Sequence, residues 1–545
     1  MLLSAVLPDT EPSRIPSRKL ILSFAILTAL LLQIPDAGGA TVQQGSKARA
    51  HSQTPATSSN SLVMELRSRQ EKLDAAKNSG DPAAIVDASR QLIATALRQI
   101  GRLKSIEGAS PEAIEILRRS IDFQDSPDTH VDLAAAYFAV GQLDKCLSET
   151  ANTIAASPEN AGAWYLYAKV LTEKKDYRRA EGAKQEASRL VRGDAAHSDL
   201  DIPQHPTPKQ RQSARVQERE LSKMLASALN DLGTTEARQQ KFDLALAHFH
   251  EAERWRADTP GLMRNIGLAA VRLSDYHEAV RALRPVVAAD PSDQVARSLL
   301  GTSLFSIQNF SEAVRVFAPL GDSVLQEPEL AYAWADSLIK TTQFPQATVL
   351  LDKLEKQTLP PETLVLVAQA WSQMGNYPRA IESCHKALQL DPKLRNAHFI
   401  AGMAMIRSDH PAEAIAEFTT ELELDPDNND AQYHLAFALS QLSRGDEAVE
   451  LLRGVLARDP NHAQANYELG RELLGEGKKE EAIRYLEAAA RLNPRLDAVH
   501  YQLQSAYRAM GRKDDADREL KIYRDMKAKN RNVNISSPMS ESTSK

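Results

Sequence analysis

The sequence has little cysteine, few aromatic residues and no strong excess of either charge. Two cysteines among 545 residues are too few for a disulfide framework or for a cysteine-rich zinc or iron–sulfur site. Phe, Trp and Tyr make up 5% of the chain, which favours Ala- and Leu-rich helices over several large aromatic cores. With 66 basic and 72 acidic residues and a net charge of −6, the chain lacks the basic surface that releases counterions from phosphates, so we expect no nucleic-acid partner.

Long apolar runs are also missing. The run Leu20–Ile34 has 15 residues, fewer than the ~20 that span a bilayer. Basic residues precede it and the small residues of 37–40 follow it, which is the pattern of a secretory signal. We therefore expect residues 1–40 to be a signal peptide cleaved after Ala40, and the mature protein to be exported to the periplasm or secreted. An uncleaved signal anchor that tethers the protein to a membrane is the alternative. The Ser/Thr-rich residues 41–61 predict a disordered spacer.

Most of the remaining chain repeats with a period of 34 residues. Pro392, Pro426, Pro460 and Pro494 are 34 positions apart, each after Asp or Asn. With this proline at position 32, units start near residues 94, 127, 161, 226, 260, 294, 328, 361, 395, 429, 463 and 497. Position 20 is Ala in eleven of these twelve units and Cys146 in the other, and position 8 is Gly or Ala in eleven. One supersecondary element is therefore repeated along the chain.

Each unit predicts two helices packed as a hairpin. Positions 4, 7, 8 and 11 form an apolar stripe at helical spacing, and positions 20, 24 and 27 form the matching stripe on the second helix. Small residues at positions 8 and 20 allow the two helices to approach closely. A polar turn that often contains Gly separates them, and the proline at position 32 ends the second helix. Because one hairpin cannot bury its own apolar faces, the hairpins must stack on one another.

This pattern resembles the tetratricopeptide repeat (TPR) family, and Trp164, Gly301, Phe305, Ala313 and Phe317 are typical matches to its consensus. The resemblance implies an all-α fold, a TPR α-solenoid in which about 12 helix hairpins form a right-handed superhelix. The expected order along the chain is an N-terminal helical array, a linker, a C-terminal array with a charged capping helix, and a disordered tail. Their expected ranges are 62–192, 193–212, 213–529 and 530–545.

The linker separates the units that start at 161 and 226. Residues 193–212 are polar and contain three prolines, which predicts a flexible spacer between two arrays, with a long helix starting near Ser213. A hinge or a partner-contact loop is the alternative. The segment also contains His197, Asp199, Asp201 and His205, which are metal-binding residue types, but a flexible segment does not hold a coordination shell in place.

No catalytic constellation is recognisable in the sequence. The spacing of Gly470, Gly475 and Lys478 differs from that of a phosphate-binding loop, and no strand precedes them. Cys146 and Cys384 occupy inward-facing positions in distant units, so we expect both to be buried and unpaired. We therefore predict no catalytic residue, no cofactor and no metal site, and we expect the protein not to be an enzyme.

The candidate functional surface follows from the family resemblance, which places positions 5, 9 and 12 of each first helix on a concave inner wall. Aromatic residues at position 5 of the last units form a ladder, which predicts an apolar partner groove. Arg471 and Arg508 are expected to meet a carboxylate or another acidic group of the partner, and polar residues occupy the wall earlier in the chain. The alternative is that the tyrosines only pack between repeats. The predicted groove residues are Asn230, Arg264, Asn265, Tyr332, Phe399, Tyr433, Phe437, Tyr467, Arg471, Tyr501 and Arg508.

The function that these features favour is that of a non-enzymatic scaffold or adaptor. It would bind an extended peptide or protein segment in its concave groove during assembly of envelope or secreted complexes. A periplasmic adaptor for polysaccharide export or cell-envelope biogenesis is the alternative. The expected partner is a protein or peptide; binding of glycans instead would favour the alternative. Membrane contact, if any, would come only through an uncleaved signal anchor.

Overall fold

The computed structural model describes residues 59–190 and 206–536, and every regular element within these ranges is helical. The chain divides into two compact units. We call them the amino-terminal unit, whose described residues end at Gln308, and the carboxy-terminal unit, whose described residues begin at Asn309. The prediction of an all-α fold is confirmed. Three of the predicted features lie outside the described residues: the signal at 1–40, most of the spacer at 41–61, and the His and Asp residues between 197 and 205.

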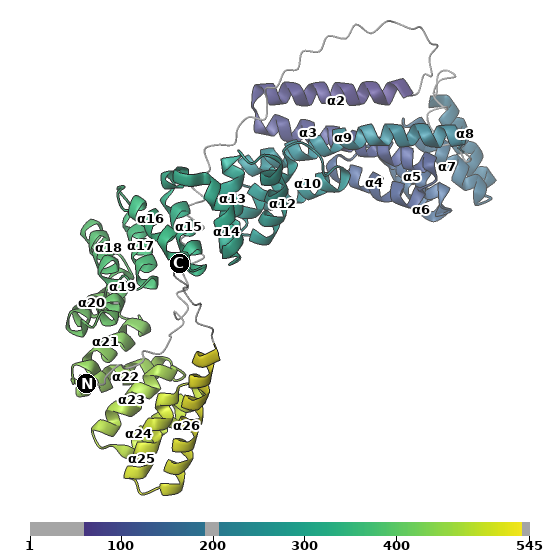
Figure 1. Ribbon diagram of the computed structural model, residues 1–545. Helices are drawn as coiled ribbons and strands as arrows, with labels where there is room; N and C mark the ends of the chain where they lie inside the picture. Colours follow the sequence, from purple (N-terminus) through teal and green to yellow (C-terminus); the bar gives the residue numbers. More distant parts are fainter. Residues whose placement is uncertain (1–58, 191–205, 537–545) are drawn as a thin grey trace. The chain divides into compact units, whose positions relative to one another are not determined.

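The amino-terminal unit contains helices α2 to α13 (Figure 1). Their bounds are α2 Ser59–Ser79, α3 Pro82–Glu107, α4 Ser110–Phe123, α5 Pro127–Ala139, α6 Leu143–Ala156, α7 Ala161–Glu173, α8 Tyr177–Leu190, α9 Pro208–Arg238, α10 Phe242–Trp255, α11 Leu262–Arg272, α12 Tyr276–Ala289 and α13 Gln294–Ser306.

The carboxy-terminal unit contains helices α14 to α26 and one 3-10 segment, η2. Their bounds are α14 Phe310–Phe317, η2 Ala318–Gln326, α15 Pro328–Lys340, α16 Phe344–Leu354, α17 Pro361–Gln373, α18 Tyr377–Leu390, α19 Ala397–Arg407, α20 Pro411–Leu424, α21 Asn429–Gln441, α22 Gly445–Arg458, α23 Ala463–Gly475, α24 Lys479–Leu492, α25 Asp497–Ala509 and α26 Lys513–Ser536.

The helices follow the 34-residue repeat that was predicted from the prolines. For most of the units the first helix starts at the residue expected, as α5, α7, α13, α15, α17, α21, α23 and α25 show. Side-chain caps fix several of these starts: Asn160 Oδ1 accepts a hydrogen bond from the backbone N of Ala163 at 2.9 Å, and Asn428 Oδ1 accepts one from Ala431 N at 3.0 Å. Such caps satisfy backbone donors that no helical carbonyl reaches.

Small residues at positions 8 and 20 bring the two helices of a hairpin together, as predicted. The position-20 residues are buried, with exposed fractions between 0% and 4%. At position 8, a Cβ added to Gly470 would lie 2.6 Å from Leu486 Cγ, and one added to Gly402 would lie 2.7 Å from Phe418 Cε1. At these two glycines the missing Cβ therefore makes room for the large side chain at position 24 of the second helix.

The turn inside every hairpin uses a left-handed residue at position 15. Glycine takes this place in some units, for example Gly477 with φ 81°. Other units place a side chain there, such as Ser274 with φ 58° and Lys175 with φ 64°. Because a Cβ makes this conformation costly, the units without glycine carry local backbone strain.

Several helix boundaries differ from those expected, and three of them have a clear physical reason or a marked extent. Helix α9 starts at Pro208, inside the expected linker 193–212, because Thr207 and Gln210 form a capping box: Thr207 Oγ1 accepts from Gln210 N, and Gln210 Oε1 accepts from Thr207 N at 2.9 Å. Helix α26 continues to Ser536, inside the expected tail. Helix α14 ends at Phe317, where Pro319 opens the 3-10 segment η2, because proline removes a helical hydrogen bond.

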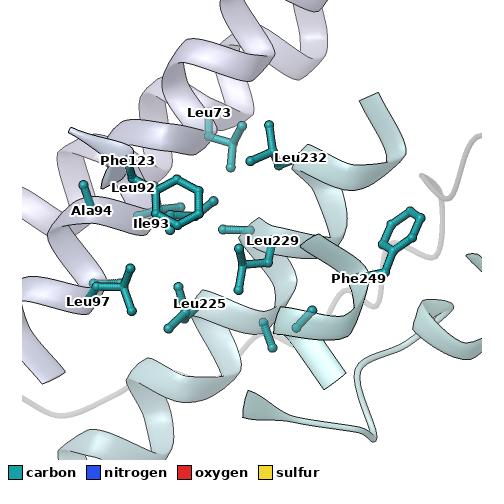
Figure 2. Close-up of a cluster of buried hydrophobic side chains, with 14 of the residues drawn as sticks. Leu73, Leu92, Ile93, Ala94, Leu97, Phe123, Leu225, Leu229, Leu232 and Phe249 are labelled. Atoms are coloured by element: carbon teal, nitrogen blue, oxygen red, sulfur yellow. The ribbon is translucent and has the colours of Figure 1, made fainter. Parts of the chain in front are cut away.

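The amino-terminal unit is held together by α3 and α9, which pack antiparallel. Lys104, near the end of α3, lies 2.8 Å from Glu218 in the first half of α9. Lys77, in the last turn of α2, pairs with Asp231 near the end of α9. Figure 2 shows the leucines of α9 facing the apolar side chains of α2 and α3. The labelled side chains of this contact are Leu73, Leu92, Ile93, Leu97, Leu225, Leu229 and Leu232.

The expected division into two arrays at 193–212 stays a prediction, but this contact shows that the two stretches pack against each other. Residues of α2 to α4, earlier in the chain, and of α9 to α12, after the segment, belong to one buried cluster and to one compact unit. The physical reason is the length of α9, which begins well before the repeat unit at 226 and continues its apolar face along α3. The segment 193–212 therefore separates two stretches of the sequence that pack together.

Candidate partner-binding surface

The predicted aromatic residues of the last repeats lie on successive first helices of the carboxy-terminal unit. Phe399 is on α19, Tyr433 and Phe437 are on α21, Tyr467 is on α23 and Tyr501 is on α25. Phe399, Phe437 and Tyr467 are half-buried, and Tyr501 is 52% exposed. We call Phe399, Phe437, Tyr467 and Tyr501 the aromatic face.

Tyr332 and Tyr433 differ from the other predicted groove residues because they are buried, with 3% and 7% of their surface exposed. Burial raises the pKa of the Tyr433 phenol above its usual value, and the nearby Glu468 carboxylate adds to the effect. Their contribution to an exposed wall is therefore small. For these two residues, packing between repeats describes the structure better than a partner-facing ladder.

Two histidines that sequence reasoning missed complete the aromatic packing around Tyr433. Its ring centroid lies 4.8 Å from that of His434 and 4.8 Å from that of His462, and His434 is 5.7 Å from Phe399. Burial lowers the pKa of His434 to about 3 and also lowers that of His462. Both imidazoles are therefore neutral at pH 7, as an aromatic cluster requires.

Arg471 is already paired within the protein. Its Nη2 lies 2.9 Å from Glu468 Oε2 and 2.9 Å from Glu472 Oε1, and it donates a hydrogen bond to the Ser440 hydroxyl. An acidic partner group that meets Arg471 would therefore have to compete with Glu468 and Glu472. Glu468 at the i−3 position was a signal in the sequence, because residues three apart on a helix are neighbours.

Arg508 matches the expectation better. It is exposed on α25, and the described part of the chain offers it no ion-pair partner. The Tyr501 ring lies 5.6 Å from the ring of Tyr523 on α26. This end of the aromatic face therefore combines exposed aromatic surface with one available cation.

The polar residues predicted earlier in the chain form hydrogen bonds with one another in the amino-terminal unit. Asn265 Nδ2 donates to Asn230 Oδ1 at 2.9 Å and lies 3.3 Å from Thr234 Oγ1. Arg264 Nε donates to Asp293 Oδ2 at 3.0 Å. These residues come from α9, α11 and the cap of α13, so the structure brings them together as a polar cluster separate from the aromatic face.

No metal-binding geometry is found in the described ranges, where no group of three or more His, Cys, Asp or Glu side chains could hold an ion. Both cysteines are buried and unpaired, as predicted, and burial raises the pKa of each thiol to about 12. Helices within the described residues are too short or too polar to cross a membrane.

The stacked helical hairpins with small residues at their contacts define an all-α helical repeat protein. Family models described as tetratricopeptide repeat match residues 264–318, 405–469 and 463–496. Residues 264–318 and 405–496 are therefore tetratricopeptide repeats.

Three solved structures illustrate the likeness. MamA from Desulfovibrio magneticus RS-1 is 19% identical, with 31% of this chain and 96% of that chain covered and a TM-score of 0.30. YrrB, described as a TPR protein with an unusual peptide-binding site, is 22% identical over 33% of this chain and 91% of its own, with a TM-score of 0.28. The APC/C hetero-tetramer Cut9–Hcn1 is 14% identical over 83% and 99%, with a TM-score of 0.36. No curated protein sequence matches the chain.

Proposed function

We propose that the protein is a non-enzymatic scaffold that binds an extended apolar segment of a protein partner along the aromatic face. The observation that carries this proposal is the recurrence of one partly exposed aromatic residue on each of four successive first helices, Phe399, Phe437, Tyr467 and Tyr501. A solenoid suits an extended ligand because every repeat adds a similar small contact. Aromatic side chains supply large contact areas with few rotatable bonds.

The charges near the aromatic face favour a partner segment that is apolar at its centre. Arg471 is paired with Glu472 and also contacts Glu468, so it attracts an anion weakly. Arg508 remains available at the α25 end. The partner is therefore expected to place apolar side chains along α19, α21 and α23 and an acidic group, where it has one, near Arg508.

The test is affinity capture and peptide-library binding with a triple variant, Phe437→Ala, Tyr467→Ala and Tyr501→Ala. Binding of peptides selected by the parent protein should weaken at least about tenfold, because central aromatic contacts carry most of an interface's energy. The matched control is Leu390→Ala with Leu492→Ala, which truncates exposed apolar side chains on second helices. A folded triple variant that keeps every partner would contradict the proposal, as would capture of glycans and no peptide.

We also propose that the protein acts outside the cytoplasm after removal of residues 1–40. The support is the sequence pattern around Leu20–Ile34. N-terminal sequencing of the protein from its native cells should begin at Thr41. A start at Met1 together with cytosolic fractionation would contradict export.

A further inference from the structure

A polar pocket of about 340 Å³ lies in the amino-terminal unit where α3, α9 and the end of α10 meet. Helix α9 lines it with Arg215, Glu218 and Arg219, which recur at helical spacing on one face. The end of α10 adds the indole of Trp255. Residues 215–219 precede the repeat unit at 226, so the pocket is built by the extension of α9 and not by the repeat pattern.

The cations around the pocket are not equally available. Lys104 lies 2.8 Å from Glu218, 3.5 Å from Glu112 and 3.9 Å from Glu107, so its charge is used within the protein. Arg256 is held by both carboxylate oxygens of Asp258, at 2.6 and 2.7 Å.

The two remaining guanidinium groups are different. Arg215 is 62% exposed and lies 4.0 Å from Glu107, beyond hydrogen-bond distance. Arg219 is exposed and has no hydrogen-bond or ion-pair partner among the described side chains. They project one helical turn apart from α9, an arrangement of like charges that a shared anion would stabilise. Beside them the half-buried Trp255 offers an apolar surface to the pocket.

We propose that this pocket binds a carboxylate attached to an aromatic or apolar group, with the carboxylate held by Arg215 and Arg219 and the apolar group against Trp255. Planar guanidinium groups match a carboxylate with two parallel hydrogen bonds. Glu107 and Glu218 border the same pocket, so a singly charged carboxylate fits its charge balance better than a doubly charged phosphate. The ligand is either the C-terminal residue of a protein or a free aromatic acid.

This proposal is independent of the aromatic face, because the pocket residues belong to another compact unit of the chain. Its test is calorimetric titration of the full chain with N-acetyl-L-phenylalanine and with its uncharged amide. The acid should bind at least about tenfold more tightly than the amide, since the amide lacks the charge-assisted hydrogen bonds. Equal binding of acid and amide, or no binding of the acid at millimolar concentration, overturns the proposal.

Variants then locate the site. Arg219→Gln should weaken binding of the acid about tenfold, whereas Arg211→Gln, an exposed arginine on the same helix, should leave it unchanged. Both replacements are at exposed helix positions, and circular dichroism checks that each variant is folded. An unchanged affinity in a folded Arg219→Gln variant overturns the proposal, as does inorganic phosphate that displaces the acid at equal concentration.

A last comparison distinguishes the two sources of the carboxylate. A peptide that ends in a free phenylalanine carboxylate should bind more tightly than N-acetyl-L-phenylalanine if the ligand is a protein terminus, because further residues add contacts. Equal affinities identify a free aromatic acid as the ligand. With either ligand, amidation of the carboxylate should weaken binding. A peptide that binds equally well with its C-terminus amidated overturns the proposal.

Discussion

Arg119 on α4 donates a hydrogen bond from its Nε to Glu251 Oε1 on α10 at 2.9 Å, although 132 positions separate the two residues. The Glu251 side chain is buried, and the Arg119 guanidinium also lies over the Phe123 ring, 4.5 Å from its centroid. This ion pair joins the second helices of two hairpins whose first helices are α3 and α9. Its contribution to stability therefore measures how strongly the α3–α4 hairpin is held against the α9–α10 hairpin within the amino-terminal unit.

The first prediction concerns this junction. Arg119→Met should lower the free energy of unfolding by about 2 kcal/mol, because it leaves the buried Glu251 carboxylate without its cation. The value is below that for a fully buried pair because Arg119 is 40% exposed. Adding Glu251→Met should restore most of the loss, since an apolar pair of similar size avoids the desolvation of two charges. Urea unfolding followed by circular dichroism measures the free energy of unfolding of each variant. If the loss in the double variant equals the sum of the losses in the two single variants, Arg119 and Glu251 do not stabilise each other.

The junction is also the part of the fold that sequence reasoning missed. The register of the hairpins follows from local features, a proline at position 32 and small residues at positions 8 and 20, which act within about one repeat. The contact between Leu97 and the leucines of α9 depends on how the chain returns after more than a hundred residues, and no periodicity encodes that. The start of α9 was predictable, however, because Thr207, Pro208 and Gln210 carry a capping box with proline at the first helical position.

The second prediction tests the close approach of the hairpin helices. Gly470→Ala should destabilise the protein by about 1–3 kcal/mol, because the new Cβ would lie 2.6 Å from Leu486 Cγ. Gly475→Ala, on the same helix, has no heavy atom within 4 Å of its added Cβ and should be neutral or stabilising by up to about 1 kcal/mol. Thermal unfolding of the two variants gives the comparison. Equal effects would mean that helix propensity and not contact decides at Gly470.

The third prediction exploits the left-handed turn at position 15. Ser274→Gly should stabilise the protein by about 1 kcal/mol, because glycine adopts φ 58° without the clash that a Cβ makes. Gly477→Ala should cost a similar amount, and since an added Cβ meets nothing within 4 Å there, the cost comes from the backbone alone. Denaturation midpoints measure both changes. A destabilising Ser274→Gly would show that the entropy of the unfolded chain outweighs the relief of strain.

For the candidate surface, the sequence predicted which helices carry the aromatic residues but not how exposed those residues are. Sequence position placed Phe399 through Tyr501 on first helices correctly, because the repeat register is precise. It did not give their exposure, which depends on the packing around each ring: Tyr433 is covered by the rings of His434 and His462, whereas Tyr501, beside Tyr523, remains 52% exposed. The two histidines were missed because their ring contacts with Tyr433 and Phe399 appear only when the helices are packed in three dimensions.

The last prediction concerns Glu468, which is buried on α23 next to Tyr467 in the sequence. Burial raises its pKa from 4.5 to about 7, with the nearby Glu472 adding to the shift and Arg471 opposing it. The folded protein therefore keeps a proton between pH 4.5 and 7 that the unfolded chain has released, so this residue makes stability fall as pH rises through that range. The full change is about 3 kcal/mol, from 1.4 kcal/mol per pKa unit.

Glu468→Gln isolates this contribution. The variant should equal the parent in stability near pH 4 and exceed it by up to about 3 kcal/mol at pH 8, because the amide needs no proton to remain buried. The lowered pKa values of His434 and His462 act in the opposite direction, since their stabilising effect is lost as pH falls below 6.5; both occur in parent and variant and cancel in the difference. Urea midpoints at pH 4, 6 and 8 supply that difference. If it stays constant with pH, Glu468 is ionised in the folded protein and Arg471 stabilises the carboxylate more than burial destabilises it.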